Sequence, residues 1–126
     1  MTILSGDYAI ARASADAPVP PQILDGPGFV SVSRTEDELS VVALTSRIPE
    51  MDRIDTGWTV FKLHGPFAFD EVGIVAGLSR PIADAGIGIF VVSTFDTDYL
   101  LIKTKDADAA ANLWRQQGHD ISVQTE

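Results

Sequence analysis

The chain has 126 residues, of which 45% are hydrophobic and 21% charged, which predicts one globular unit or two very small ones and excludes a disordered protein. Its formal net charge is −9 and it has no basic run, so nucleic acid and anionic membrane surfaces are not expected as partners. It contains no cysteine, which excludes disulfides, thiolate catalysis and zinc–thiolate sites.

The first half of the chain predicts strands and no long helix. Apolar and polar side chains alternate in residues 7–13 and again in residues 29–34, so both segments are expected to be strands. The proline-rich residues between them, 14–28, predict a loop with at most one helical turn. Residues 35–38 form a turn, and residues 39–45 are the returning strand of a hairpin.

A polar segment separates the two halves of the chain. Residues 46–57 include Pro49 and Gly57, which predicts a linker. We therefore expect two units, one over residues 1–50 and one over residues 57–126.

The second unit opens with a strand over residues 58–64. In residues 71–85, apolar side chains recur at spacings of three and four, which predicts an amphipathic helix. Pro81 lies within this helix, where it removes one backbone hydrogen bond and produces a kink. Gly86 is expected to end the helix.

Three strands and a second helix complete this unit. Residues 89–94 are apolar on both faces, which predicts a central strand covered on both sides. Residues 98–103 form the next strand after a tight turn. A helix then begins near Asp106, buries an alanine-rich face and ends at Gly118, and residues 120–124 form the last strand.

The order of elements in the second unit is β-α-β-β-α-β. This is the order of the ferredoxin-like fold, an antiparallel sheet of four strands with two helices on one face. The predicted fold class is therefore α+β. The β-rich first half looks like a truncated version of the same unit that has lost most of its helices.

The connection after the first strand of the second unit, residues 65–74, is one part of a candidate binding site. Asp70 opens the helix, and Phe69 and Ile74 can pack against each other as a hydrophobic staple across its start. The other part is residues 93–98, STFDTD, which carry two carboxylates and three hydroxyl groups. Side by side, the two segments would form a site with a positive end and a negative end.

Such a site suits a zwitterion such as a free amino acid. The N–H groups of Val72 and Gly73 at a helix N-terminus can bind its carboxylate, and Gly73 allows a close approach because it has no Cβ. Asp96 and Asp98 can accept hydrogen bonds from its ammonium group. Structural alternatives are open for two of the carboxylates, because Asp70 also suits an N-cap and Asp96 a turn.

Three stretches of the chain resemble the ACT-domain family: TEDELSVVALTSRIP at 35–49, GWTVFKLHGPFAFDEVGIVAGLSRPIADAGI at 57–87 and IFVVSTFDTDYLLIK at 89–103. They are similar to small tandem ACT proteins related to the amino-acid-sensing domains of aspartate kinases and to the cytosolic arginine sensors. The resemblance implies βαββαβ units that pair side by side, bind small effectors and regulate rather than catalyse. It therefore implies a non-enzymatic homodimer that binds an amino acid and needs no cofactor.

The resemblance also implies where the ligand binds. In kinase-type relatives the ligand contacts the loop after the first strand, the start of the first helix and the following strand. Carried over residue by residue, these positions are Phe69, Asp70, Val72, Gly73, Ile74, Ser93, Thr94, Phe95, Asp96, Thr97 and Asp98.

Two other functions remain alternatives. A structural or protein-interaction module of the same fold would close the cleft between residues 65–74 and 93–98 with aromatic side chains such as Phe67, Phe69 and Phe95. A small acid–base enzyme would place Asp96 or Asp98 in a pocket beside His64.

Several sites and locations are not expected. The two histidines, His64 and His119, do not form a metal-ligand set with the scattered carboxylates, and no nucleotide-binding motif occurs. No signal peptide is apparent, and no apolar stretch reaches the roughly 20 residues that cross a bilayer. With the absence of cysteine, this predicts a cytoplasmic protein. Its homodimer is expected to bury strand 89–94 and the sheet face around Trp58 and Val60.

Overall fold

The computed structural model describes residues 1–65 and 73–125, which fall into two compact units. The first unit is Gly6–Trp58, and the second joins Met1–Ser5 to Thr59–Glu126. Each unit contains a hydrophobic core of its own.

The first unit consists of strands, one short α-helix and one 3-10 helix, and its described residues form no long helix, as predicted. In chain order its elements are β2 (Tyr8–Ala13), α1 (Pro21–Leu24), β3 (Ser31–Arg34), β4 (Leu39–Leu44), the 3-10 helix η1 (Thr45–Arg47) and the start of β5 (Arg53–Lys62). The strands are antiparallel in the order β3-β4-β2-β5. Ile23 of α1 packs with Leu39 and Val41 of β4 in the core of this unit.

The prediction of a linker over residues 46–57 is wrong for its second part, because residues 53–57 belong to strand β5. This part of β5 pairs with β2, and the register shifts between Tyr8 and Ile10, where β5 has one residue more than β2. Gly57 lies at the shift with a φ of 80°, the left-handed conformation that a β-bulge places on glycine. A polar glycine-containing segment therefore continues a strand here instead of interrupting it.

Arg47 fixes the loop that follows α1. Its guanidinium donates hydrogen bonds to the backbone oxygens of Gln22 (3.1 Å) and Ile23 (2.7 Å), and also to those of Asp25 and Pro27. One side chain thus satisfies the carbonyl groups at the end of a four-residue helix that could not persist without tertiary contacts.

The substitution Arg47→Met is expected to lower the free energy of unfolding by about 1 kcal/mol. Methionine keeps an apolar stem but donates no hydrogen bond, so the loop loses its anchor. Urea denaturation measures the effect. The matched control is Arg53→Met, which removes an exposed arginine of β5 and should change the free energy of unfolding by less than ~0.5 kcal/mol. Equal stability of the two variants would contradict the anchoring role.

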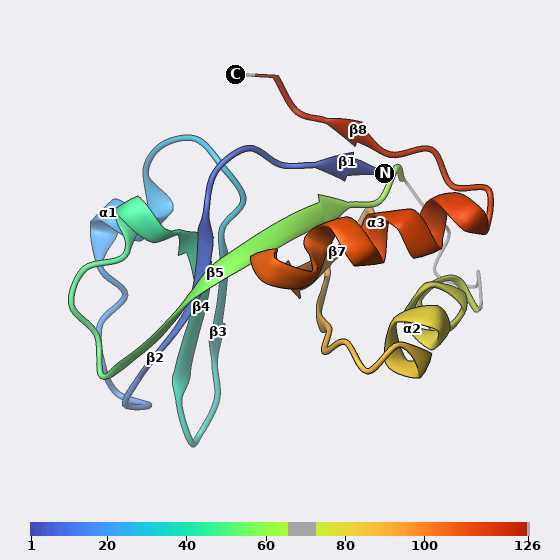
Figure 1. The fold of residues 1–126 in the computed structure, drawn as a ribbon. Helices are drawn as coiled ribbons and strands as arrows, with labels where there is room; N and C mark the ends of the chain where they lie inside the picture. The colour runs from blue at the N-terminus through green and yellow to red at the C-terminus, as the bar shows by residue number, and fades with distance from the viewer. Residues whose placement is uncertain (66–72, 126) are drawn as a thin grey trace. The chain divides into compact units, whose positions relative to one another are not determined.

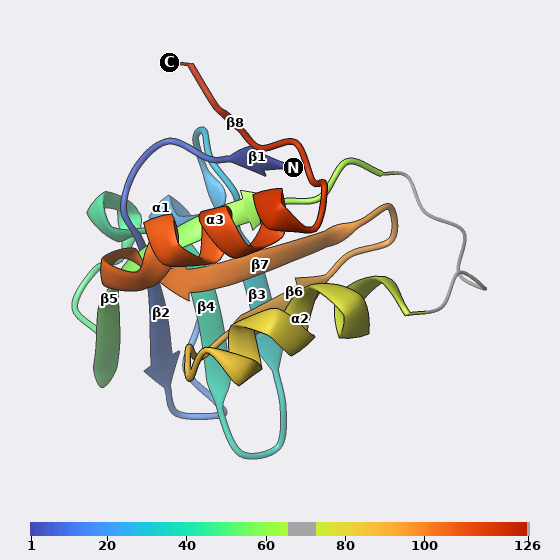
Figure 2. The same cartoon turned by 45° about the vertical axis from the view of Figure 1, so that its right-hand side comes forward.

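The second unit has the predicted α+β, ferredoxin-like fold (Figures 1 and 2). From β5 onward its elements are α2 (Ile74–Asp84), β6 (Phe90–Ser93), β7 (Asp98–Lys103), the 3-10 helix η2 (Thr104–Asp106), α3 (Ala107–Gln116) and β8 (Ser122–Val123). Both long helices, α2 and α3, lie on the same face of β6 and β7 (Figure 2). The order of strands and helices from β5 to β8 is therefore the predicted β-α-β-β-α-β.

One strand of this unit has no counterpart among the predicted elements. Strand β1 (Thr2–Ile3) pairs antiparallel with β5 and parallel with β8, so it lies between the first and last strands of the βαββαβ unit (Figure 1). Two residues are too few to show an alternating pattern, and their partners lie far along the chain. Thr2, for example, faces Lys62 and Ser122.

The predicted central position of strand 89–94 is wrong. In the described part of the chain β6 pairs only with β7, and Val91 is 37% exposed. The βαββαβ order places its second strand at the edge of the sheet, and an apolar run of four residues does not reveal that position. The prediction that Val60 lies on a sheet face open to a second copy is also wrong, because Val60 is fully buried within the monomer.

Helix α2 begins later than predicted. Gly73 has a φ of 80° and is the N-cap of a helix that starts at Ile74, and residues 71 and 72 of the predicted helix lie outside the described residues. Its end is as predicted: Gly86 has a φ of 74°, and the N–H groups of Gly86 and Ile87 bond back to carbonyls of the last turn. These bonds form a Schellman motif, which satisfies carbonyl groups at the helix end.

Candidate functional site

Residues 93–98 form the hairpin between β6 and β7. Ser93 and Asp98 face each other in register, and the Ser93 hydroxyl donates a hydrogen bond to the Asp98 carboxylate. The N–H and the hydroxyl of Thr94 donate to the Thr97 carbonyl oxygen over 2.8 and 3.1 Å. The six predicted ligand contacts in this segment therefore belong to one ordered turn.

The residues at the tip of this turn differ in exposure. The Phe95 side chain is 78% exposed and Asp96 is exposed, whereas Thr97 is only 7% exposed. The Thr97 hydroxyl donates to the carbonyl oxygen of Leu63, just after β5, over 3.1 Å. The turn is thus fixed to the end of β5, and Phe95 and Asp96 face solvent.

Gly65 lies directly against this turn. A Cβ at Gly65 would be 2.6 Å from the Asp96 carbonyl oxygen and 2.8 Å from the Thr97 Cβ, closer than real Cβ atoms approach. Glycine is therefore required here by the close approach of another backbone. This contact brings the start of residues 65–74 next to residues 93–98.

Gly73 and Ile74 lie at the start of α2. No described side chain caps the helix at Gly73, and its first turn contains no acidic residue. Within the described residues, no atom lies within 4 Å of a Cβ built on Gly73. Ile74 is half-buried and packs against the core of the unit. The remaining predicted contacts, Phe69, Asp70 and Val72, lie outside the described residues, as does the Phe69–Ile74 staple.

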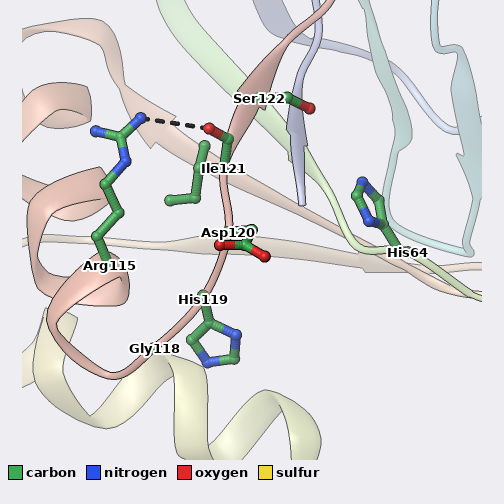
Figure 3. Close-up of a pocket in the computed structure, with 7 residues that line it drawn as sticks. All are labelled: His64, Arg115, Gly118, His119, Asp120, Ile121 and Ser122. Carbon is green, nitrogen blue, oxygen red and sulfur yellow. Dashed lines mark hydrogen bonds between the residues drawn. The ribbon is translucent and has the colours of Figure 1, made fainter.

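A pocket of about 400 Å³ opens in the second unit, where β5 and α3 end and β8 begins (Figure 3). It contains both histidines of the chain. The lining residues are His64, Arg115, Gly118, His119, Asp120, Ile121 and Ser122.

Hydrogen bonds tie the pocket walls to neighbouring strands. The His64 Nε2 lies 2.8 Å from the Thr2 hydroxyl oxygen, which lies 3.3 Å from the Ser122 hydroxyl. Arg115 donates to the Ile121 carbonyl oxygen over 3.5 Å (Figure 3). The end of β5, strand β1 and the start of β8 are thus linked by polar side chains on one side of the pocket.

The Met1 amino group adds a further link, since it donates to the Asp120 carbonyl oxygen over 2.7 Å. Burial lowers the pKa of this amino group below its ordinary value, and the nearby Asp120 carboxylate opposes that shift. Asp120 is also the carboxylate that lines the pocket with His64. Asp96 and Asp98, the carboxylates of the acid–base alternative, are not among the residues that line this pocket.

Arg115, Asp120 and Ser122 are pocket residues that the sequence pattern did not predict. The pair Gly118-His119 is the feature of the sequence that could have indicated this pocket. Gly118 has a φ of 96° and ends α3, so the residues after it must return to the sheet.

Other kinds of site have no support in the described part of the chain. There, no three histidine or carboxylate side chains are grouped so that they could hold a metal ion. No helix among the same residues is long and apolar enough to cross a membrane.

Comparison with known proteins identifies the family. A family model described as the ACT domain matches residues 53–115, which is half of the 126 residues. The chain belongs to the ACT-domain family. In this ACT-domain protein, residues 6–51 match a second model, for an N-terminal domain.

The curated relatives of this ACT-domain protein include proteins named cytosolic arginine sensor for mTORC1 subunit 1. The Homo sapiens protein is 33% identical over an alignment of 99 residues, and the match covers 72% of this chain and 29% of the relative. The Bos taurus protein is 34% identical over an alignment of 80 residues, and the match covers 60% of this chain and 22% of the relative. The ACT-domain protein thus spans less than a third of the length of these relatives.

Solved structures share the fold. Protein Atu0741 from Agobacterium tumefaciens is 50% identical with a TM-score of 0.90, over 99% of this chain and 92% of that one. Protein VC0802 from Vibrio cholerae, described as of unknown function and a possible transport protein, has 16% identity and a TM-score of 0.69 over 90% and 85%. Aspartate kinase from Clostridium acetobutylicum has 12% identity and a TM-score of 0.61 over 84% and 32%. The last two likenesses show the fold alone.

Proposed function

We propose that this ACT-domain protein is a non-catalytic regulatory module that binds a free amino acid at residues 65–74 and 93–98. The observation that carries the proposal is the contact of Gly65 with Asp96 and Thr97, which joins the start of one segment to the other. Relatives named as arginine sensors make arginine the first ligand to test.

The helix end supplies the positive part of the proposed site. The first N–H groups of α2, with those of Val72 and Gly73, would bind the ligand carboxylate, and the helix dipole favours an anion there. Because the helix has neither a side-chain cap at Gly73 nor an acidic residue in its first turn, no described side chain from this end competes with the ligand.

The hairpin supplies the negative part. Asp96 is exposed at the tip, and the half-buried Asp98 is held in place by its hydrogen bond from Ser93. One carboxylate would accept from the ammonium group, and a guanidinium, as in arginine, could engage the other in a bidentate pair. Each charge-assisted hydrogen bond contributes roughly 1.5–3 kcal/mol, and three or four of them, offset by ordering costs, give a Kd on the order of micromolar.

The other properties that we propose follow from the family. Residues 1–50 would be a truncated ACT-like half, and residues 57–126 the ACT domain that binds the ligand. The protein would act in the cytoplasm as a homodimer. Light scattering of the purified protein tests the oligomeric state.

We expect arginine or another amino acid to raise the melting temperature in a thermal-shift screen of all twenty. A ligand at 100 times its Kd stabilises the folded state by about 2.7 kcal/mol, which corresponds to several degrees for a chain of this length. Asp98→Asn should abolish the rise, because the ammonium or guanidinium group loses its charged acceptor. Glu36→Gln is the matched control, since it removes one negative charge from an exposed turn in the other unit.

Gly73→Ala tests the helix end independently. A Cβ would project into the space that the ligand carboxylate needs, so the Kd should rise about tenfold, or 1.4 kcal/mol. Gly86→Ala is the control: it imposes the same left-handed strain at the other end of α2, with similar loss of stability and an unchanged Kd.

The absence of any response among the twenty amino acids, in a folded protein, would overturn the proposed function and favour the structural module. That alternative requires aromatic side chains to close the cleft. Phe95, one of the three side chains named for it, is instead 78% exposed, and Phe67 and Phe69 lie outside the described residues. The geometry of the described residues therefore favours the ligand-binding module.

A further inference from the structure

Helix α2 is a weak helix by its own sequence. Its eleven residues include Gly77, Ser79 and Pro81. In a helix interior, glycine costs about 1 kcal/mol and proline about 3 kcal/mol relative to alanine. The Ser79 hydroxyl also donates to the Val75 carbonyl oxygen over 2.8 Å, a back-bond that bends helices. Contacts outside the helix must therefore hold it in shape.

Pro81 leaves one backbone acceptor of α2 without its usual donor. In a regular helix the N–H of residue 81 would bond to the carbonyl oxygen of Gly77, but proline has no N–H. The Nε2 of Gln117, the residue that caps the C-terminus of α3, lies 3.4 Å from that oxygen and donates to it. The gap that proline creates in one helix is thus filled by a side chain of the other.

The next carbonyl group of α2, that of Leu78, also accepts a hydrogen bond from a side chain of α3. The buried Trp114 Nε1 of α3 donates to the Leu78 carbonyl oxygen over 2.8 Å. Two consecutive carbonyl groups of α2 therefore accept hydrogen bonds from side chains three residues apart on α3. Residues at that spacing share one helix face, so the two bonds act as a pair.

One hydrogen bond within α2 connects these contacts to the proposed ligand site. The Gly77 N–H donates to the Gly73 carbonyl oxygen over 2.9 Å and closes the first turn of α2. Gly77 is thus held from two sides, by Gly73 within the helix and by Gln117 from α3. Movement of Gln117 would shift the turn that presents its N–H groups to the ligand.

We propose that Gln117 is a positioning residue for the amino-acid site, because Pro81 frees the Gly77 carbonyl oxygen for it and it thereby anchors the first turn of α2. This inference rests on the proposed function for its effect on the ligand. The anchoring itself does not depend on a ligand, so it can be measured separately.

The test is a double-mutant cycle of Gln117→Leu and Pro81→Ala, with two readouts. The first is the hydrogen-exchange rate of the Gly77 amide in the free protein, and the second is the Kd for the amino acid found in the screen. Gln117→Leu is expected to increase both about fivefold, the factor that corresponds to the ~1 kcal/mol of one hydrogen bond. Gln116→Leu, at the neighbouring exposed position of α3, is the matched control and should change neither.

Pro81→Ala decides between anchoring and a general loss of packing. Alanine restores an N–H that can bond to the Gly77 carbonyl oxygen, so Gln117→Leu should then have no effect on Gly77 exchange. The same fivefold increase with and without Pro81→Ala would overturn the inference, as would equal exchange rates in Gln117→Leu and Gln116→Leu. If no amino acid binds but the exchange cycle behaves as expected, the proposed function fails while the anchor stands.

Discussion

Trp114→Ala is expected to lower the free energy of unfolding by about 3–5 kcal/mol, the largest effect of any substitution considered for this protein. Trp114 is fully buried in the core of the second unit. Its ring packs edge-on against Phe61 of β5, with the ring centres 4.9 Å apart and the planes at 78°. Alanine would remove this aromatic contact, leave a cavity between α3 and β5, and remove the hydrogen bond from Trp114 Nε1 to the Leu78 carbonyl oxygen.

Denaturation in urea measures the loss, and Trp114→Phe separates its parts. Phenylalanine retains most of the buried ring but cannot donate to Leu78, so a cost of about 1–3 kcal/mol is expected. Far-UV circular dichroism, which needs no tryptophan, reports unfolding in both variants. A Trp114→Phe variant as unstable as Trp114→Ala would show that the hydrogen bond, and not the volume, dominates. A Trp114→Ala variant as stable as the wild type would contradict the assigned core.

The parts of the fold that the sequence predicts are those with a long, local pattern. The alanine and tryptophan spacing of α3 extends over enough residues to fix both the type of element and the buried face. The order β-α-β-β-α-β then restricts the topology, because few sheets accommodate it. The family resemblance and the spacing lead to the same fold by separate routes.

The errors occur where a contact distant in the sequence decides the structure. Residues 46–57 have the composition of a linker, but the pairing of β5 with β2 places Gly57 in a bulge within β5. Strand β6 has the apolar run of a central strand, but its place at the edge depends on which strands β7 and β5 select as neighbours. Strand β1 exists only because β5 and β8 flank it. No window of local sequence contains this information.

In the candidate site, too, the local features are predictable from the sequence and the contacts distant in the sequence are not. The hairpin of residues 93–98 is predictable from its turn-forming residues, since hydroxyl and carboxylate side chains bond to nearby backbone groups. The burial of Thr97 is not predictable, because it depends on the Leu63 carbonyl oxygen 34 residues away. In the sequence, Gly65 has the pattern of an ordinary turn glycine. In the structure, a Cβ added at Gly65 would collide with the backbone of residue 96.

Gly65→Val is therefore expected to destabilise the protein by about 2–3 kcal/mol and to weaken amino-acid binding. The nearest atom to a new Cβ is the Asp96 carbonyl oxygen, 2.6 Å away, which belongs to the backbone and cannot rotate aside. The hairpin would have to move away from β5, which breaks the bond from Thr97 to Leu63. Thermal denaturation and the ligand Kd measure the two effects.

Gly88→Val provides the comparison, since no described atom lies within 4 Å of a Cβ at that exposed glycine. It should cost less than ~0.5 kcal/mol and leave the Kd unchanged. If Gly65→Val proved as stable as Gly88→Val, the hairpin would not be pressed against the end of β5. The two loops of the proposed site would then lack the contact that joins them, and amino-acid binding would need a different location. If Gly65→Val is unstable and Gly88→Val is not, a single close approach of two backbones holds the hairpin against the end of β5 and joins the two segments of the proposed site.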